Sequence, residues 1–227
     1  MKVLDLHPWQ VTTAQAREIQ LELAGKARRV NEIGQVRLVA AADMSAPRGA
    51  PATAAVVVLS YPALELVEVR TVQRKLSFPY VPGLLSFREA PLVLEAWQKV
   101  TLSPDLLLVD GQGIAHPRRM GIAAHLGLLV DIPTIGCAKS RLIGEHDEVG
   151  AEAGSCTVLT DQGEVIGAVV RTRTGSRPLY VSIGNKVDLR ASVEWVLNCC
   201  RGHRLPEPAR LAHLAAGGRL PEMTPGR

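Results

Sequence analysis

The chain has 227 residues, 47% of them hydrophobic and 21% charged, with a formal net charge of +4. This length fits one large domain, and so high an apolar content excludes a natively disordered chain. No run of about 18 uncharged apolar residues is present, which excludes a membrane-spanning helix. The first nine residues also lack the apolar segment of a signal peptide, so we expect a cytoplasmic protein with no membrane partner.

Arginine is much more frequent than lysine in this basic chain. The planar guanidinium group binds two phosphate oxygens at once, so an anionic polymer such as nucleic acid is an admissible partner. A charge of +4 is also compatible with a general compositional bias toward arginine. The composition therefore permits a nucleic-acid partner without requiring one.

The first predicted elements are a helix and three strands. Residues 12–30 carry apolar side chains at helical spacing behind a possible N-cap, Thr12 or Thr13. Strands are predicted at 36–42, 54–60 and 65–74, with turn residues between them. We expect these three strands to form an antiparallel meander.

The pattern then changes to alternating strands and helices, which is typical of parallel strands with helical crossovers. The predicted elements are a helix at 91–99, a strand at 106–110, a helix at 118–128 and a strand at 134–138. Further strands are expected around the turns at 161–163 and 174–176, followed by helices at 189–200 and 207–216. We predict one domain over residues 1–227, with a frayed tail at 217–227.

Two aspartates end apolar strands in this pattern. Asp110 follows the run 105–109, and Asp43 follows the run 36–42. A carboxylate buried at a strand end needs a partner, and magnesium prefers such hard oxygen ligands. A magnesium ion can polarise a phosphodiester and supply a hydroxide nucleophile. The alternative is that each aspartate caps a local turn.

Glu89 is the third candidate carboxylate. Ser86 and Glu89 have the spacing of a helix capping box, which would give Glu89 a structural role. Pro91 favours the first helical position and disfavours helical angles in the residue before it. We therefore expect the helix to begin at Pro91 and Glu89 to lie in the preceding loop, pointing at the ion.

The segment 78–83 contains two prolines and two aromatic residues. Prolines restrict such a turn, so presenting an aromatic tip costs little entropy, and an aromatic tip can replace a base in a stack. The alternative is a loop whose aromatic side chains pack on the body of the protein.

The turn after Asp110 begins Gly111-Gln112-Gly113 and has His116 where a dinucleotide-binding loop has its third glycine. We reject a dinucleotide site and infer that these glycines let a planar base approach the backbone. Lys139 follows the strand 134–138, where it could reach a phosphate.

Six segments together resemble one family, Endonuclease V, the deoxyinosine-directed DNA repair nucleases. The longest is the motif F-P-Y-V-P-G-L-L-S-F-R-E at 78–89. The other matching segments are 41–45, 108–113, 136–140, 171–175 and 205–213. The resemblance extends from about Trp9 to Ala216. Departures are Asn185, where relatives often have histidine, and Met44 and Ala46 in the first acidic motif.

The resemblance implies an α/β protein with a ribonuclease-H-like fold: a mixed central sheet, three antiparallel strands and then parallel β-α-β units, flanked by helices. That fold places carboxylates at the ends of its first and fourth strands, here Asp43 and Asp110. It also implies hydrolysis of DNA with magnesium, for which manganese can substitute. We expect a monomer, although the sequence itself does not reveal the oligomeric state. Such enzymes recognise hypoxanthine and cut the second phosphodiester bond on its 3′ side, leaving 3′-hydroxyl and 5′-phosphate ends.

Twelve residues are candidates for the site, and the resemblance implies the roles of the metal ligands, of Lys139, His213 and Tyr80, and of His116 as a DNA contact. Asp43, Asp110 and Glu89 would bind metal, Lys139 would assist at the phosphate, and His213 would support the site. Tyr80 would be the wedge that fills the space of the extruded base. The other substrate-binding candidates are Pro79, Gly83, Leu85, Gly111, Gly113 and His116. The alternatives are a ribonuclease for inosine-containing or structured RNA, and a non-catalytic nucleic-acid-binding module on the same fold.

Overall fold

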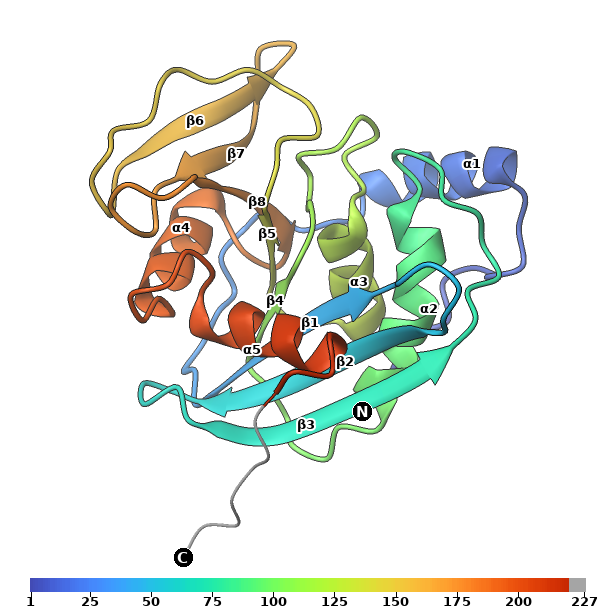
Figure 1. Ribbon diagram of the computed structural model, residues 1–227. Helices are drawn as coiled ribbons and strands as arrows, with labels where there is room; N and C mark the ends of the chain where they lie inside the picture. The colour runs from blue at the N-terminus through green and yellow to red at the C-terminus, as the bar shows by residue number, and fades with distance from the viewer. Residues whose placement is uncertain (221–227) are drawn as a thin grey trace, which may run out of the picture.

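A computed structural model describes residues 1–220, which form one eight-stranded mixed sheet of order β3-β2-β1-β4-β5-β8-β7-β6 (Figure 1). The strands are β1 (Leu38–Ser45), β2 (Ala52–Ser60), β3 (Leu66–Arg74), β4 (Leu106–Val109), β5 (Thr134–Ala138), β6 (Cys156–Asp161), β7 (Glu164–Val170) and β8 (Leu179–Asn185). The helices are α1 (Thr13–Ala24), α2 (Leu85–Gln98), α3 (Ile122–Val130), α4 (Leu189–Asn198) and α5 (Glu207–Ala216).

The predicted fold is confirmed. Strands β1, β2 and β3 form an antiparallel meander, and β1, β4 and β5 lie parallel to one another. Strands β6 to β8 extend the sheet with antiparallel pairings beyond β5. Because β1, β4 and β5 are parallel, all three end at one edge of the sheet, here called the carboxyl edge. Strand β2 runs the opposite way and therefore begins at that edge.

Alternate residues of the central strands enter two different cores, as the two-residue period of a strand requires. Val39 and Ala41 of β1 face a core shared with α4 and α5, whereas Ala40 and Ala42 face one shared with α2 and α3. Both faces of the sheet are therefore covered by helices (Figure 1). This explains why the strands read as continuous apolar runs.

Helix α1 is shorter than predicted. Thr12 is its N-cap and completes a capping box with Gln15, but the helix ends at Ala24, with Gly25 as C-cap. The following segment instead pairs with the chain after β8, where the N–H of Lys186 donates to the carbonyl of Arg28. The apolar spacing continued to Val30, but these backbone bonds keep that segment extended.

Helix α2 is longer than predicted, and the expected start at Pro91 is wrong. The helix begins at Leu85 and contains Pro91 in its interior, so Glu89 lies on a helix and not in a loop. Proline lacks an N–H and so removes one helical hydrogen bond, but packing outweighs this loss. Phe87, Leu94 and Trp97 of α2 are almost completely buried.

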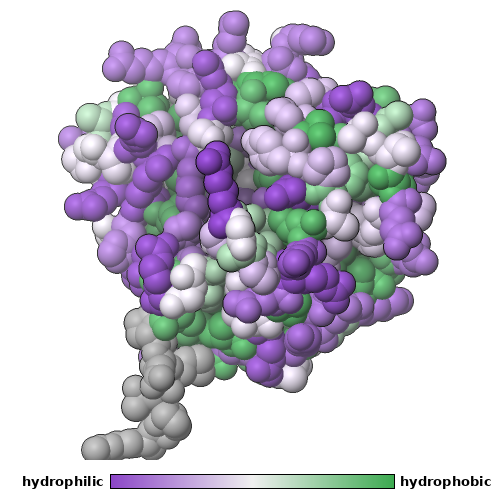
Figure 2. Space-filling view, turned by 45° about the vertical axis from the view of Figure 1, so that its right-hand side comes forward, coloured by the Kyte–Doolittle hydropathy of each residue, from purple (hydrophilic) through white to green (hydrophobic). Residues whose placement is uncertain are grey.

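Two further boundaries differ. Helix α3 begins at Ile122 and not near 118, because Arg119 adopts a left-handed conformation with φ 54° inside a turn. Helix α5 has the predicted bounds, and most of the tail predicted to fray, 221–227, lies outside the described residues. Hydrophilic side chains dominate the surface in Figure 2, with small apolar patches between them. Within residues 1–220, no helix is both long and apolar enough to cross a membrane.

Candidate functional site

Three charged side chains continue the row of residues that faces α5. Val39 and Ala41 in β1, Leu106 and Leu108 in β4, and Ile135 and Cys137 in β5 belong to this row. Asp43, Asp110 and Lys139 lie two residues after the last of these in each strand, that is, after Ala41, Leu108 and Cys137. The two-residue period thus carries one charged group from each of three adjacent strands to the same side of the carboxyl edge.

Asp43 lies within β1, which continues to Ser45, so the prediction that it ends the strand is wrong by two residues. Its carboxylate is 10% exposed and accepts hydrogen bonds from two groups. The backbone N–H of Met44 donates to Oδ1 at 2.7 Å, and Nδ1 of His213 on α5 donates to Oδ2 at 2.8 Å. Helix α5 therefore contributes a side chain to the edge formed by the strands.

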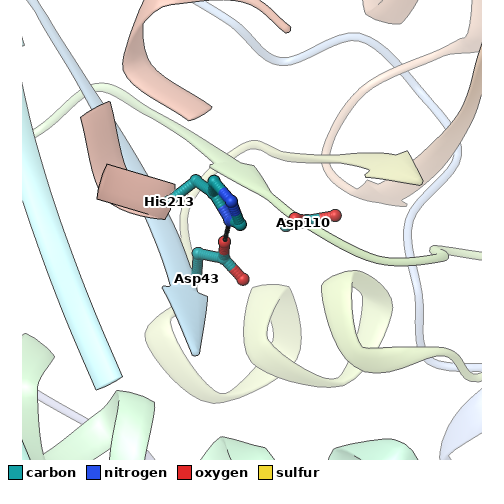
Figure 3. A group of neighbouring side chains, drawn as sticks. All are labelled: Asp43, Asp110 and His213. Carbon is teal, nitrogen blue, oxygen red and sulfur yellow. Dashed lines mark hydrogen bonds and ion pairs between the residues drawn. The ribbon is translucent and has the colours of Figure 1, made fainter. Parts of the chain in front are cut away.

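Asp110 directly follows β4, as predicted, and lies beside the Asp43–His213 pair (Figure 3). Its backbone N–H donates to the carbonyl of Ala42 at 3.1 Å, which holds the two aspartates at neighbouring strand positions. The ammonium group of Lys139 contacts Oδ2 of Asp110 and lies 3.9 Å from Oδ2 of Asp43. One oxygen from each aspartate and one nitrogen of His213 lie within 4.8 Å of one another.

Glu89 reaches this group from α2, on the opposite side of the edge, but is not one of the three residues whose donor atoms cluster. Burial, followed by the charges of Asp43 and Asp110, raises the pKa of Glu89 to about 8. Burial and the charge of Asp43 likewise raise the pKa of Asp110 to about 6, against the opposing effect of Lys139. Both shifts indicate an excess of negative charge in a poorly solvated place.

The donor set fits a divalent cation. Two carboxylates with a third nearby offer hard oxygen ligands, and the imidazole adds a nitrogen that manganese accepts readily. A cation would also stabilise the ionised forms of Asp110 and Glu89, which burial disfavours. The arrangement supports the expected metal role of Asp43 and Asp110, adds His213 as a candidate ligand, and places Glu89 next to the cluster.

A cavity of about 370 Å³ adjoins this group along the carboxyl edge. Asp110 and Lys139 line it, and so does Tyr80, whose side chain is 71% exposed. Of the predicted substrate-binding residues, the cavity is lined by Tyr80, Gly83, Leu85, Gly111 and His116. The two aromatic residues of the segment 78–83 therefore differ. Phe78 packs into the body of the protein against Phe87, whereas Tyr80 faces solvent.

Two buried polar atoms in the cavity wall lack partners. Within residues 1–220, neither Oγ of Ser86 nor Oε1 of Gln112 has a hydrogen-bond partner. Ser86 is 1% exposed and Gln112 is 8% exposed. An unsatisfied buried polar atom costs about 1–3 kcal/mol, so such atoms in a cavity wall favour a polar ligand.

The carbonyl oxygen of Gly83 is held by three donors. Nε2 of Gln20, Nε2 of His116 and a guanidinium nitrogen of Arg118 lie 3.1, 3.0 and 2.7 Å from it. Nδ1 of His116 accepts from the backbone N–H of Arg118, so both ring nitrogens are engaged within the protein. Burial lowers the pKa of His116 to about 4, despite its bond to Gly83. His116 thus positions the loop that carries Tyr80.

Two predicted substrate-binding residues do not line the cavity. Pro79 is exposed beside it. Gly113 packs against β8, where a Cβ atom would lie 1.9 Å from the carbonyl oxygen of Ile183. Gly111 does line the cavity, with φ 158°, and a Cβ atom added to it would lie 2.4 Å from Cγ2 of Ile122. The second glycine of the turn therefore permits close packing of the sheet and not the approach of a base.

The sequence also left some lining residues unnoticed. Gln20, Ile122, Ser140 and Leu142 line the cavity and were not predicted. Gln20 had a usable signal, because it is a polar residue on the apolar stripe of α1, next to Ala16 and Leu23. Asn185, a departure from the family pattern, is buried and bonds to the carbonyl of Gly127, so its role is structural.

Comparison with known proteins agrees with the resemblance seen in the sequence. The family model for Endonuclease V matches residues 20–214. The chain belongs to the Endonuclease V family. Endonuclease V of Gloeobacter violaceus is 53% identical over 214 residues, covering 92% of this chain and 87% of that protein.

Solved structures of Endonuclease V agree with the fold. The Bacillus subtilis enzyme superposes with a TM-score of 0.91 at 32% identity, covering 96% of each chain. Endonuclease V of Ciona intestinalis, solved in complex with a 24mer DNA containing an inosine followed by a ribo-adenosine, has a TM-score of 0.77 at 30% identity. That comparison covers 90% of this chain and 96% of the Ciona chain. The family is one of nucleases, so the carboxyl edge is the candidate catalytic edge.

Proposed function

We propose that this Endonuclease V family member hydrolyses DNA beside a deaminated base, with a divalent cation, preferably magnesium, at the Asp43–Asp110–His213 cluster. The observation that carries the proposal is that Asp110 belongs both to the cluster and to the wall of a cavity that contains unpartnered polar atoms. The complex of the Ciona relative with inosine-containing DNA supports a hypoxanthine base as the occupant.

Asp43 and Asp110 would hold the cation, with Glu89 and His213 beside them. When bound, the cation supplies an activated water and neutralises the charge that develops on the leaving oxygen. Lys139 is 35% exposed, so its ammonium can turn from Asp110 toward a phosphate oxygen. His213 orients the carboxylate of Asp43 through its bond at 2.8 Å.

The cavity would receive the extruded base. Ser86 Oγ and Gln112 Oε1 are available to pair with its edge, and Gly111 allows close approach of the backbone. Tyr80 would fill the space that the base leaves in the duplex. Extrusion costs a few kcal/mol and less at a mispaired base, which favours the lesion. We propose cleavage of the second phosphodiester bond 3′ to that base, giving 3′-hydroxyl and 5′-phosphate ends.

A nicking assay tests the proposal. A labelled duplex with one inosine is incubated with the protein in magnesium, in manganese and in EDTA, and the cut is mapped to the nucleotide. We expect a nick at the second linkage in either metal and none in EDTA. Asp110→Ala should abolish it, while the exposed Asp147→Ala serves as a matched control with full activity. Near-wild-type turnover of the Asp110 variant would overturn the metal assignment.

The same assay separates the alternatives. Binding of the inosine duplex without any nick in either metal would favour a non-catalytic binding module. Competition between matched DNA and RNA strands would reveal a ribonuclease, through preferential cleavage of the RNA. We propose that residues 1–227 form a single catalytic domain and that the protein acts as a cytoplasmic monomer.

A further inference from the structure

A second cleft, here called the basic cleft, lies at the carboxyl edge beside the β1–β2 hairpin. It has a volume of about 510 Å³ and is formed by residues 46–50, Ala52, Lys75, Leu76 and Arg88. Three of these residues are basic, Arg48, Lys75 and Arg88, and none is acidic. The basic cleft thus gathers three positive charges in one place, in a protein whose net charge is only +4.

None of the three basic residues of the basic cleft forms an ion pair within the described residues, although the charge of Arg88 acts on the neighbouring Glu89. Within residues 1–220, no carboxylate lies within 4.0 Å of the basic groups of Arg48, Lys75 or Arg88, whereas the neighbouring Arg74 pairs with Glu95 at 2.6 Å. Arg48 and Lys75 are exposed. Arg88 is half-buried, and one guanidinium nitrogen donates to the carbonyl of Phe78 at 2.6 Å. Unpaired like charges around a cleft favour an anionic ligand.

Sheet order places the basic cleft on the far side of the carboxylates from the cavity. Along the carboxyl edge the strands follow one another as β5, β4, β1 and β2. The cavity uses residues that follow β4 and β5, the carboxylates stand at β4 and β1, and the cleft uses the β1–β2 hairpin. The start of helix α2 shows the same order of cavity and basic cleft, because Leu85 and Ser86 line the cavity and Arg88 lines the basic cleft.

We propose that the basic cleft binds backbone phosphates of the cut strand on the 3′ side of the nick. The inference rests on the proposed function. If the base occupies the cavity and the scissile phosphate, which lies 3′ to it, occupies the cluster, then the strand beyond the cluster is the 3′ flank. Arg48 and Lys75 contact successive phosphates there. They position the strand without reading its sequence.

Salt dependence of binding tests the phosphate contacts. Affinity for an inosine duplex is measured in the Asp110→Ala background, to prevent cleavage, over a range of salt concentrations. Each phosphate contact contributes about 0.9 to the slope of log affinity against log salt, or roughly 8-fold in affinity at 0.1 M salt. Replacing Arg48 and Lys75 by glutamine should make this negative slope shallower by about 1.8 and weaken binding roughly 60-fold at 0.1 M salt.

A matched control removes two charges at the opposite edge of the sheet. Arg37 precedes the start of β1, Lys99 follows the end of α2, and both are exposed. The Arg37→Gln, Lys99→Gln variant should keep the wild-type slope to within about 0.5. If both double variants change the slope equally, the effect is one of net charge and the basic cleft is not a phosphate site.

Truncated duplexes test the direction of the strand. One duplex ends two base pairs beyond the predicted nick on the 3′ side, and the other is shortened equally on the 5′ side. The Arg48→Gln, Lys75→Gln variant should bind the 3′-truncated duplex within about 2-fold of the parent, and the 5′-truncated duplex with its full defect. A full defect on the 3′-truncated duplex would overturn the inference. Because these are binding measurements, an absence of nicking by the wild type would count only against the proposed function.

Discussion

Replacement of Glu89 by glutamine should change how the stability of the metal-free protein depends on pH. Burial and the charges of Asp43 and Asp110 raise the pKa of Glu89 from 4.5 to about 8. Between these values the folded protein holds a proton that the unfolded chain has released. The free energy of unfolding therefore falls as pH rises through this window, because the unfolded chain gains the free energy of ionising this carboxyl while the folded protein keeps it protonated. Glutamine cannot ionise and removes this dependence.

The size of the effect follows from the shift. A difference of one pKa unit corresponds to about 1.4 kcal/mol, so the full shift is equivalent to about 5 kcal/mol at high pH. Roughly 1 kcal/mol of this is already present at pH 5, which leaves about 4 kcal/mol between pH 5 and pH 9. Glu89 is half-buried, and solvent screening lowers the expected difference to about 2–4 kcal/mol.

Urea denaturation of both proteins in EDTA, at pH 5 and pH 9, measures this difference. The glutamine variant should gain stability over the wild type as pH rises. Magnesium should then stabilise the wild type at pH 9 more than the variant, because a cation offsets the buried charge. A difference between the two proteins that stays constant from pH 5 to pH 9 would refute the reasoning, since Glu89 would then titrate as an ordinary exposed glutamate.

Three further variants test the cavity and the sheet. Tyr80→Ala should leave thermal stability unchanged, because the side chain is exposed, and should weaken binding to an inosine duplex by about 1–3 kcal/mol more than binding to an undamaged one; equal losses would argue against a wedge. Ser86→Ala removes an unpartnered hydroxyl, so the free protein should keep or gain up to about 1 kcal/mol while inosine binding weakens; unchanged inosine binding would show that this hydroxyl does not contact the base. Gly113→Ala should cost about 3 kcal/mol or more in urea denaturation, because its Cβ would overlap the carbonyl of Ile183. Gly34→Ala, with open space at its Cβ, is the control and should cost less than about 1 kcal/mol; similar costs for both glycines would contradict the packing argument.

The candidate catalytic edge could be predicted from the sequence where the local pattern decides the position of a residue. Apolar runs that each end at a charged residue, in strands predicted to be parallel, are enough to bring Asp43, Asp110 and Lys139 together. The two-residue period of a strand then places all three side chains on the same face of the sheet. The bounds of α5 were also predictable, since Pro206 precedes it and glycines follow it.

The remainder of the site depends on tertiary packing, which a local pattern does not contain. Pro91 is a strong local signal for a helix start, yet α2 begins six residues earlier because Phe87 and Ala90 fill the core. His213 lies 170 residues from Asp43 in the chain, and only the docking of α5 on β1 brings the two within 2.8 Å. The end of α1 was missed for a similar reason, since Lys186 pairs with Arg28 across a long separation.

Helix α2 links the three parts of the carboxyl edge. Within five residues it places Leu85 and Ser86 in the cavity wall, Glu89 beside the carboxylates and Arg88 in the basic cleft. One helix therefore fixes the spacing between the cavity and the carboxylate cluster, which under the proposed function are the base site and the site of hydrolysis. The loop before it is fixed as well, because three donors hold the carbonyl of Gly83. If the proposed function holds, we expect the enzyme to select its linkage by distance from the bound base.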